Sequence, residues 1–166
     1  HYYEINEGIG VHKSPKLYGA FPIDPYSHTP IGKGAQQPGM TGQVKEDVLS
    51  RVGELGVFVK NGSIQFRPCL LRVGEFLKEE KTFRYVDVDQ QPCELQVPEN
   101  SLAFTYCQVP VVYTISDRYE IKVAYQDGTT LNSESNTLDV ATSTKMFNRS
   151  GEVKSIHLLI NQDDLK

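Results

Sequence analysis

The sequence predicts a mainly β protein: a β-sandwich of about eight strands, preceded by an irregular loop segment and one α-helix. Three observations support this fold class. Prolines and glycines interrupt residues 1–37, an apolar repeat of helical period follows over residues 41–52, and short alternating runs separated by turn residues fill the rest of the chain. We expect two domains, 1–55 with the loop segment and helix, and 56–166 with the sandwich.

The loop segment combines helix breakers with aromatic side chains. Pro15, Pro22, Pro25 and Pro30 exclude a continuous helix. A solvated linker rarely carries so many large aromatic residues, so a packed functional loop is predicted; they are Tyr2, Tyr3, Tyr18, Phe21 and Tyr26. The segment begins with neither an initiator methionine nor an apolar signal sequence, so we expect a piece of a longer protein, and no compartment is predicted.

The predicted helix begins near Thr41, whose hydroxyl is expected to cap it. Its apolar face is formed by Val44, Val48, Leu49 and Val52, and Gly53 or Gly56 is expected to end it. We expect Val44, Val48 and Val52 of this face to be buried against the sandwich, which would then brace the domain to which the helix belongs.

Strand predictions start with a hairpin at Asn61-Gly62, because both residues tolerate the positive φ that a type I′ turn requires. Residues 101–108 and 110–116 are apolar almost throughout and are expected to lie centrally in a sheet. A short helical turn is predicted at 141–148. The remaining strands are expected within residues 82–88, 93–97, 118–126, 129–133 and 153–160.

Composition argues against several classes of function. A formal net charge of −4 and a pI near 5.6 argue against a nucleic-acid partner, and no apolar run is long enough to span a membrane. The scattered histidines match no metal-ligand spacing, so neither a metal nor a cofactor is expected. Cys69, Cys93 and Cys107 are expected to be buried free thiols on strands, with one disulfide as the alternative in a secreted protein.

A candidate binding site precedes the predicted helix. Gly42 permits close approach to the backbone, and the amides at a helix N-terminus are donors for an anion or a hydroxyl. Neutral polar groups of this kind suit a saccharide better than a metal; we assign His28, Gln37, Thr41, Gly42 and Gln43 to substrate binding and no residue to catalysis. The alternative is a rigid entry loop in which Thr41 only caps the helix.

The stretch GAQQPGMTGQVKEDVLSRVGELGVFVKNGSIQFRPCLL, residues 34–71, resembles the C-terminal part of six-hairpin glycosidases of the cellobiose phosphorylase type. Thr41-Gly42 match the family's active-site loop, Leu55-Gly56 the end of its last barrel helix, and residues 64–68 the first sandwich strand. The resemblance implies a bacterial carbohydrate-active enzyme whose N-terminal (α/α)6 barrel is the missing partner of this chain.

The resemblance also implies which ligands the site would bind and which reactions it could serve. The family's Thr-Gly pair helps to bind phosphate, so a saccharide and phosphate are the implied ligands. This sequence has neither the family's His-Gly-Glu motif nor any tryptophan, which leaves hydrolysis, phosphorolysis and lyase chemistry open. The family's general acid lies upstream of the matching region, so this chain is expected to be inactive alone. The alternatives are a non-catalytic sugar-binding module, with tyrosines as stacking platforms, and a purely structural domain.

Overall fold

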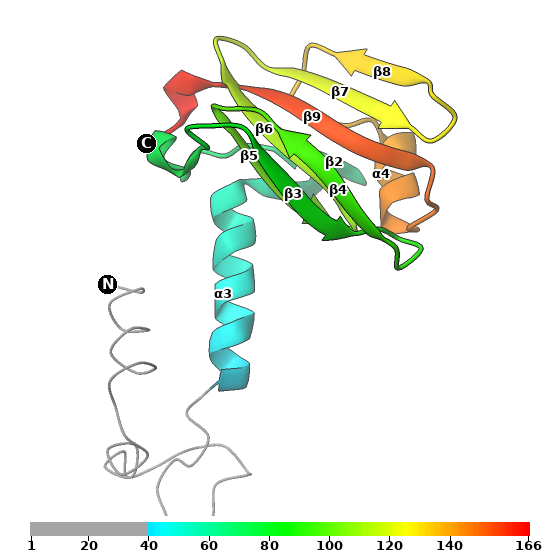
Figure 1. Ribbon diagram of the computed structural model, residues 1–166, viewed down its shortest axis with the longest axis horizontal. Coiled ribbons are helices and arrows are strands. Elements are labelled where there is room, and N and C mark those ends of the chain that lie inside the picture. Colours follow the sequence, from blue (N-terminus) through cyan, green and yellow to red (C-terminus); the bar gives the residue numbers. More distant parts are fainter. Residues whose placement is uncertain (1–39) are drawn as a thin grey trace, which may run out of the picture. The chain divides into compact units, whose positions relative to one another are not determined.

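The computed structural model describes the backbone of residues 40–166 and the side chains of residues 48–166, and the labels below are those of Figure 1. The chain divides into two units, His1–Leu49 and Ser50–Lys166. The fold described here is that of the second unit, together with the helix that begins before it. The protein is mainly β and sandwich-like, as the sequence predicted.

Helix α3 runs from Met40 to Leu55 and is longer than the repeat suggested. It begins one residue before Thr41, so Thr41 has helical backbone rather than the N-cap position predicted for it. Gly56 follows the helix with φ of 66°, a left-handed conformation that ends helices and that glycine adopts without a steric cost. Gly53, the other candidate stop, lies inside the helix.

The predicted hairpin follows at once. Strands β1 (Val57–Lys60) and β2 (Ser63–Phe66) are antiparallel, and their turn residues Asn61 and Gly62 have φ of 52° and 79°. These positive values confirm the turn predicted from the Asn-Gly pair. A 3₁₀ turn, η1 (Val73–Glu75), then leads towards a second antiparallel pair, β3 (Lys81–Val86) and β4 (Pro92–Val97).

The largest sheet has five strands in the order β5-β6-β9-β7-β8. Its strands are β5 (Ser101–Tyr106), β6 (Val109–Ser116), β7 (Glu120–Tyr125), β8 (Thr130–Ser133) and β9 (Val153–Asn161). Every run that the sequence assigned to a strand overlaps an observed strand. The predicted helical turn is α4 (Val140–Phe147), which lies between β8 and β9, and a 3₁₀ turn, η2 (Gln162–Asp164), follows β9.

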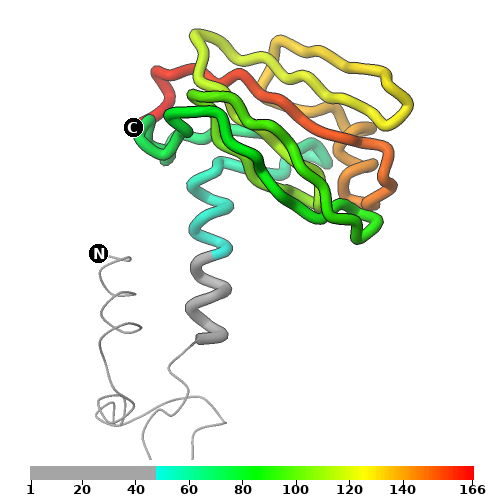
Figure 2. Tube along the Cα trace, in the orientation of Figure 1, coloured from blue at the N-terminus to red at the C-terminus, as the bar shows by residue number. Residues whose placement is uncertain are grey.

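One face of this sheet packs against β2 and α4, and part of the other face, at the β5–β6 end, is covered by the β3–β4 ribbon (Figures 1 and 2). On one face, Ile64 and Phe66 of β2 and Met146 of α4 belong to the main core cluster, together with Tyr113 of β6 and Leu158 of β9. The β3–β4 ribbon lies over the other face (Figure 1), where Val97 and Val112 are buried outside that cluster. The arrangement is therefore a five-stranded sheet between two smaller layers.

Strand positions correct one sequence prediction. The run 110–116 becomes β6, an interior strand, but the run 101–108 becomes β5, which lies at the edge of the sheet. The strand at the centre is β9, in which buried and partly exposed residues largely alternate. The apolar residues of β5 are explained by what covers its two faces and not by two neighbouring strands. Leu102 belongs to the main core, and Ala103 lines a cleft together with Phe83 and Val97 of the ribbon.

Two further expectations were wrong in part. The cysteines are free thiols, but Cys69 is exposed, Cys93 and Cys107 are only half-buried, and Cys107 occupies the β5–β6 turn rather than a strand. On α3, Val52 packs against the core as predicted, but the side chain of Val48 is 58% exposed. Leu49, whose burial was not predicted, is 71% exposed. Val44 precedes the residues whose side chains are described. None of the helices described in residues 40–166 is long and apolar enough to cross a membrane.

Candidate functional site

The predicted saccharide site lies mostly outside the described residues. His28 and Gln37 precede the first of them, and the side chains of Thr41, Gly42 and Gln43 are likewise outside the description. The backbone of these three residues forms the first turn of α3. Amides in the first turn of an α-helix have no partner within the helix, and the predicted binding site depends on this general property.

The other end of α3 is fixed in the sandwich core. Tyr113 of β6, whose side chain is fully buried, donates its hydroxyl hydrogen to the carbonyl oxygen of Leu55 at 2.8 Å. Phe66 and Phe104 pack edge-on against the Tyr113 ring, with centroid distances of 6.0 and 5.1 Å. Burial raises the pKa of Tyr113 well above its usual value, so the phenol stays protonated and keeps donating.

At Gly56 the chain passes from the helix into the sandwich, and its backbone lies directly against the backbone of Arg67. The Gly56 carbonyl accepts a hydrogen bond from Arg67 N at 2.7 Å, directly after β2. A Cβ atom on residue 56 would lie 2.0 Å from the carbonyl oxygen of Arg67, so a larger residue does not fit. The Leu55-Gly56 pair therefore has a structural role. The carbonyl oxygen of Leu55 accepts the hydrogen bond from the buried Tyr113, and Gly56 permits the sharp turn into β1.

A charged contact supports the same junction from outside. Arg51 of α3 lies 2.9 Å from Glu54 and 2.8 Å from Glu75 of η1. Partial burial disfavours the Glu75 carboxylate, but the Arg72 amide and the Arg51 guanidinium donate hydrogen bonds to it, and its pKa is lowered overall. The last turns of α3 are thus held by core packing, a buried hydrogen bond and an ion pair.

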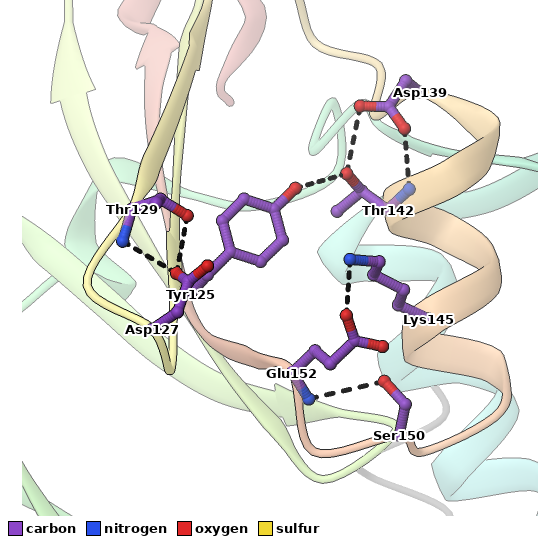
Figure 3. A network of polar contacts seen from close by, with 8 residues as sticks. All are labelled: Tyr125, Asp127, Thr129, Asp139, Thr142, Lys145, Ser150 and Glu152. Atoms are coloured by element: carbon purple, nitrogen blue, oxygen red, sulfur yellow. Dashed lines mark hydrogen bonds and ion pairs between the residues drawn. The ribbon is translucent and has the colours of Figure 1, made fainter.

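A second group of polar residues connects the β7–β8 turn to α4 (Figure 3). The hydroxyls of Tyr125 and Thr142 are 2.7 Å apart, and Asp139 accepts from both the amide and the hydroxyl of Thr142. Lys145 lies over the Tyr125 ring, 5.3 Å from its centroid, and pairs with Glu152 at 2.6 Å.

This group borders an open cleft of about 270 Å³, which Asp127 and Thr129 also line. The Asp127 carboxylate accepts hydrogen bonds from the Thr129 hydroxyl and amide, and these bonds lower its pKa. Since the charged side chains here already have protein partners, the contacts serve first to fix α4 and the neighbouring turns.

A further cleft of about 270 Å³ adjoins the first, because Gln126 lines both. It lies where the β3–β4 turn, the β5–β6 turn and the segment before β9 meet, and we call it the turn-end cleft. No sequence pattern predicted this cleft. Its polar residues stand far apart in the chain, and the only local signals were the turn residues around Asp89 and Asp127.

No protein-family model matches this sequence, and no curated protein matches it. Among residues 48–166, no group of three or more metal-ligating side chains is placed to hold an ion. The function proposed below therefore rests on the geometry of the described residues and on the sequence pattern.

Proposed function

We propose that this chain is the C-terminal part of a carbohydrate-active enzyme, a glycoside hydrolase or phosphorylase. In this role the loop and first helical turn, with His28, Gln37, Thr41, Gly42 and Gln43, contribute to a saccharide or phosphate subsite. The sandwich braces the helix that carries them. The observation behind the proposal is the order of elements: a Thr-Gly helix start, a helix that ends at Leu55-Gly56, and a strand that begins the sandwich directly afterwards.

The anchored end of α3 supports a bracing role. Helix α3 has 16 residues, and its last turn lies in the second unit together with the sandwich. The Tyr113 hydroxyl, the Gly56 turn and the Arg51–Glu75 pair all act on that last turn. An enzyme that must hold amides near a substrate gains from such restraint, because catalysis depends on preorganised donors.

The exposed residues of α3 support the presence of a packing partner. Val48 and Leu49 are adjacent, and both are more than half exposed. A solvent-facing helix normally carries polar residues at such positions. The proposed occupant is the upstream helical barrel of the same protein, in which α3 would be the last helix.

The test begins with the coding sequence upstream of His1. The chain joined to that sequence is assayed against a glycan panel with and without inorganic phosphate; free sugar as product indicates hydrolysis, and a sugar 1-phosphate indicates phosphorolysis. We expect activity in the longer chain and none in the 166-residue chain. An upstream sequence without helical hairpins, or a longer chain inactive on every glycan, would overturn the proposal.

Two substitutions separate the subsite from general effects. Thr41→Val removes the hydroxyl with little change in volume, and Ser50→Ala is the control on the same helix. We expect Thr41→Val to lower kcat/KM about tenfold or more, as the loss of a hydrogen bond to a charged ligand does, and Ser50→Ala to leave it unchanged. Equal effects of the two substitutions would show that Thr41 has no role at the subsite.

A further inference from the structure

We propose that the turn-end cleft of the sandwich binds one unit of a neutral saccharide, at a site separate from the subsite at the start of α3. The cleft is built by residues that lie far apart in the sequence, among them Asp87, Asp89, Gln108, Gln126 and Lys154. The inference concerns the sandwich alone and does not rest on the proposed catalytic role.

The walls of this cleft are fixed before any ligand arrives. One carboxylate oxygen of Asp87 accepts from the amides of Asp89 and Gln91, at 2.9 and 2.8 Å. Gln108 Nε2 donates to the Asp87 carbonyl at 3.0 Å, which ties the β5–β6 turn to the β3–β4 turn. A preformed site loses less conformational entropy on binding, so even a small cleft can hold a ligand.

The free polar groups match sugar hydroxyls. Among the described residues, the Asp89 carboxylate, the side-chain carboxamide of Gln126 and the Lys154 ammonium have no hydrogen-bond or ion-pair partner. Together they offer acceptors and donors, and a hydroxyl group uses both. Pro110 and Val153, which are buried, and Val88 supply apolar surface in the same cleft, as ligand sites commonly do.

Charge and size narrow the ligand class. The cleft has two carboxylates, of Asp87 and Asp89, against one ammonium, of Lys154, so its formal charge is 1 − 2 = −1. This balance disfavours phosphate and uronic acids. A volume of about 270 Å³ lies just below the range of typical ligand pockets, which favours a single sugar unit at the end of a chain.

Neighbouring clefts fit this role less well. In the cleft of Figure 3, Lys145 and Glu152 neutralise each other and Asp127 is occupied by Thr129. A larger cleft of about 470 Å³ lies between β8 and the segment before α4, but its one carboxylate, Asp139, is already bound to Thr142. The turn-end cleft combines a fixed frame with polar groups that are free to meet a ligand.

The test is an NMR titration of the 166-residue chain with cellobiose, maltose, xylobiose and mannobiose, each to tens of millimolar. Glucuronic acid, inorganic phosphate and Ca²⁺ are the charged comparisons. We expect at least one neutral disaccharide to cause saturable shifts at the amides of residues 87–91, 108 and 151–154. No saturable shift there with any neutral sugar, or stronger binding of a charged probe, would overturn the proposal.

A matched pair of double variants locates the site. Asp89→Ala with Gln126→Ala removes two free groups of the cleft, and Asn132→Ala with Glu134→Ala makes the same chemical change elsewhere on the exposed surface. We expect the first pair to weaken saccharide binding at least tenfold and the second to leave it unchanged, with Tm equal in both. Equal binding by the two pairs would refute the assignment. Shifts confined to residues near Thr41 would also refute it, while supporting the proposed catalytic subsite.

Discussion

At the residue scale, two glycines near the end of α3 differ in whether another residue could replace them. Gly56 combines a φ of 66° with a backbone oxygen 2.0 Å from the place of a Cβ atom. Gly53 lies inside α3, and nothing is found within 4 Å of its Cβ position. The first position excludes any other residue on both conformational and steric grounds, whereas the second merely tolerates glycine.

We predict that Gly56→Ala and Gly53→Ala change stability in opposite directions. Gly56→Ala should cost more than about 2 kcal/mol, because strain in φ adds to a clash with backbone that cannot move away cheaply. Gly53→Ala should stabilise by roughly 0.5–1 kcal/mol, since alanine is the better helix former. Urea denaturation of the 166-residue chain measures both. A neutral Gly56→Ala would mean that α3 does not end in the close turn described here.

His157 gives a second prediction at this scale. It lies on β9 between Val112 and Lys122 of the adjacent strands. Burial, and secondarily the charge of Lys122, lowers its pKa from the usual 6.5. The unfolded chain therefore takes up the proton first as pH falls, so the stability that neutral His157 contributes is complete above pH 6.5 and is lost below it.

The expected consequence is a steeper loss of stability on acidification in the wild type than in His157→Gln. Denaturation at pH 7.5 and at pH 5.5 measures the difference, and the substitution should remove part of the pH dependence. Groups that titrate elsewhere contribute equally to both proteins, so they cancel in the comparison. Identical pH profiles would show that His157 titrates like an exposed histidine.

At the element scale, α3 has two kinds of apolar position. Val52 packs against the core cluster, whereas Val48 and Leu49 are exposed. We predict that Val52→Ser destabilises the 166-residue chain by about 1–2 kcal/mol, and that Val48→Ser and Leu49→Ser each change stability by less than about 0.5 kcal/mol. Thermal denaturation compares the three. In the longer chain, the same Val48 and Leu49 substitutions should reduce activity, because they would then lie against the barrel.

The elements themselves were largely predictable from the sequence. Asn61-Gly62 requires a left-handed turn wherever it occurs between alternating apolar residues, and the structure has that turn. The order of strands was not predictable, because an apolar run reports how many faces are covered and not how many neighbours a strand has. The prediction of which α3 side chains are buried was wrong in part for a related reason. A period of 3.6 residues identifies the apolar side of a helix but does not say what covers that side.

At the scale of the whole molecule, the unpredictable features are those made by distant residues. Strand β9 inserts between β6 and β7 and pairs with β6 in parallel, after an excursion through β7, β8 and α4. Nothing local in the sequence specifies this pairing. The turn-end cleft has the same origin, since Asp89 and Lys154 reach one site only through the sheet order. The Tyr113–Leu55 hydrogen bond, which joins residues 58 apart, is a third case.

The core cluster, including the hydrophobic residues packed against it, lies between Val52 and Leu165, which leads to a prediction about autonomy. A chain of residues 50–166 should fold into the same sandwich and melt cooperatively, because it keeps Leu55, Val57 and the carbonyl that Tyr113 needs. A chain of residues 58–166 loses all three and leaves the buried Tyr113 hydroxyl without its acceptor, which costs about 1–3 kcal/mol in addition to the lost packing. We therefore expect a clearly lower Tm for the shorter chain, measured by circular dichroism. Equal Tm values would mean that the end of α3 does not contribute to the sandwich, and they would contradict the proposed bracing role.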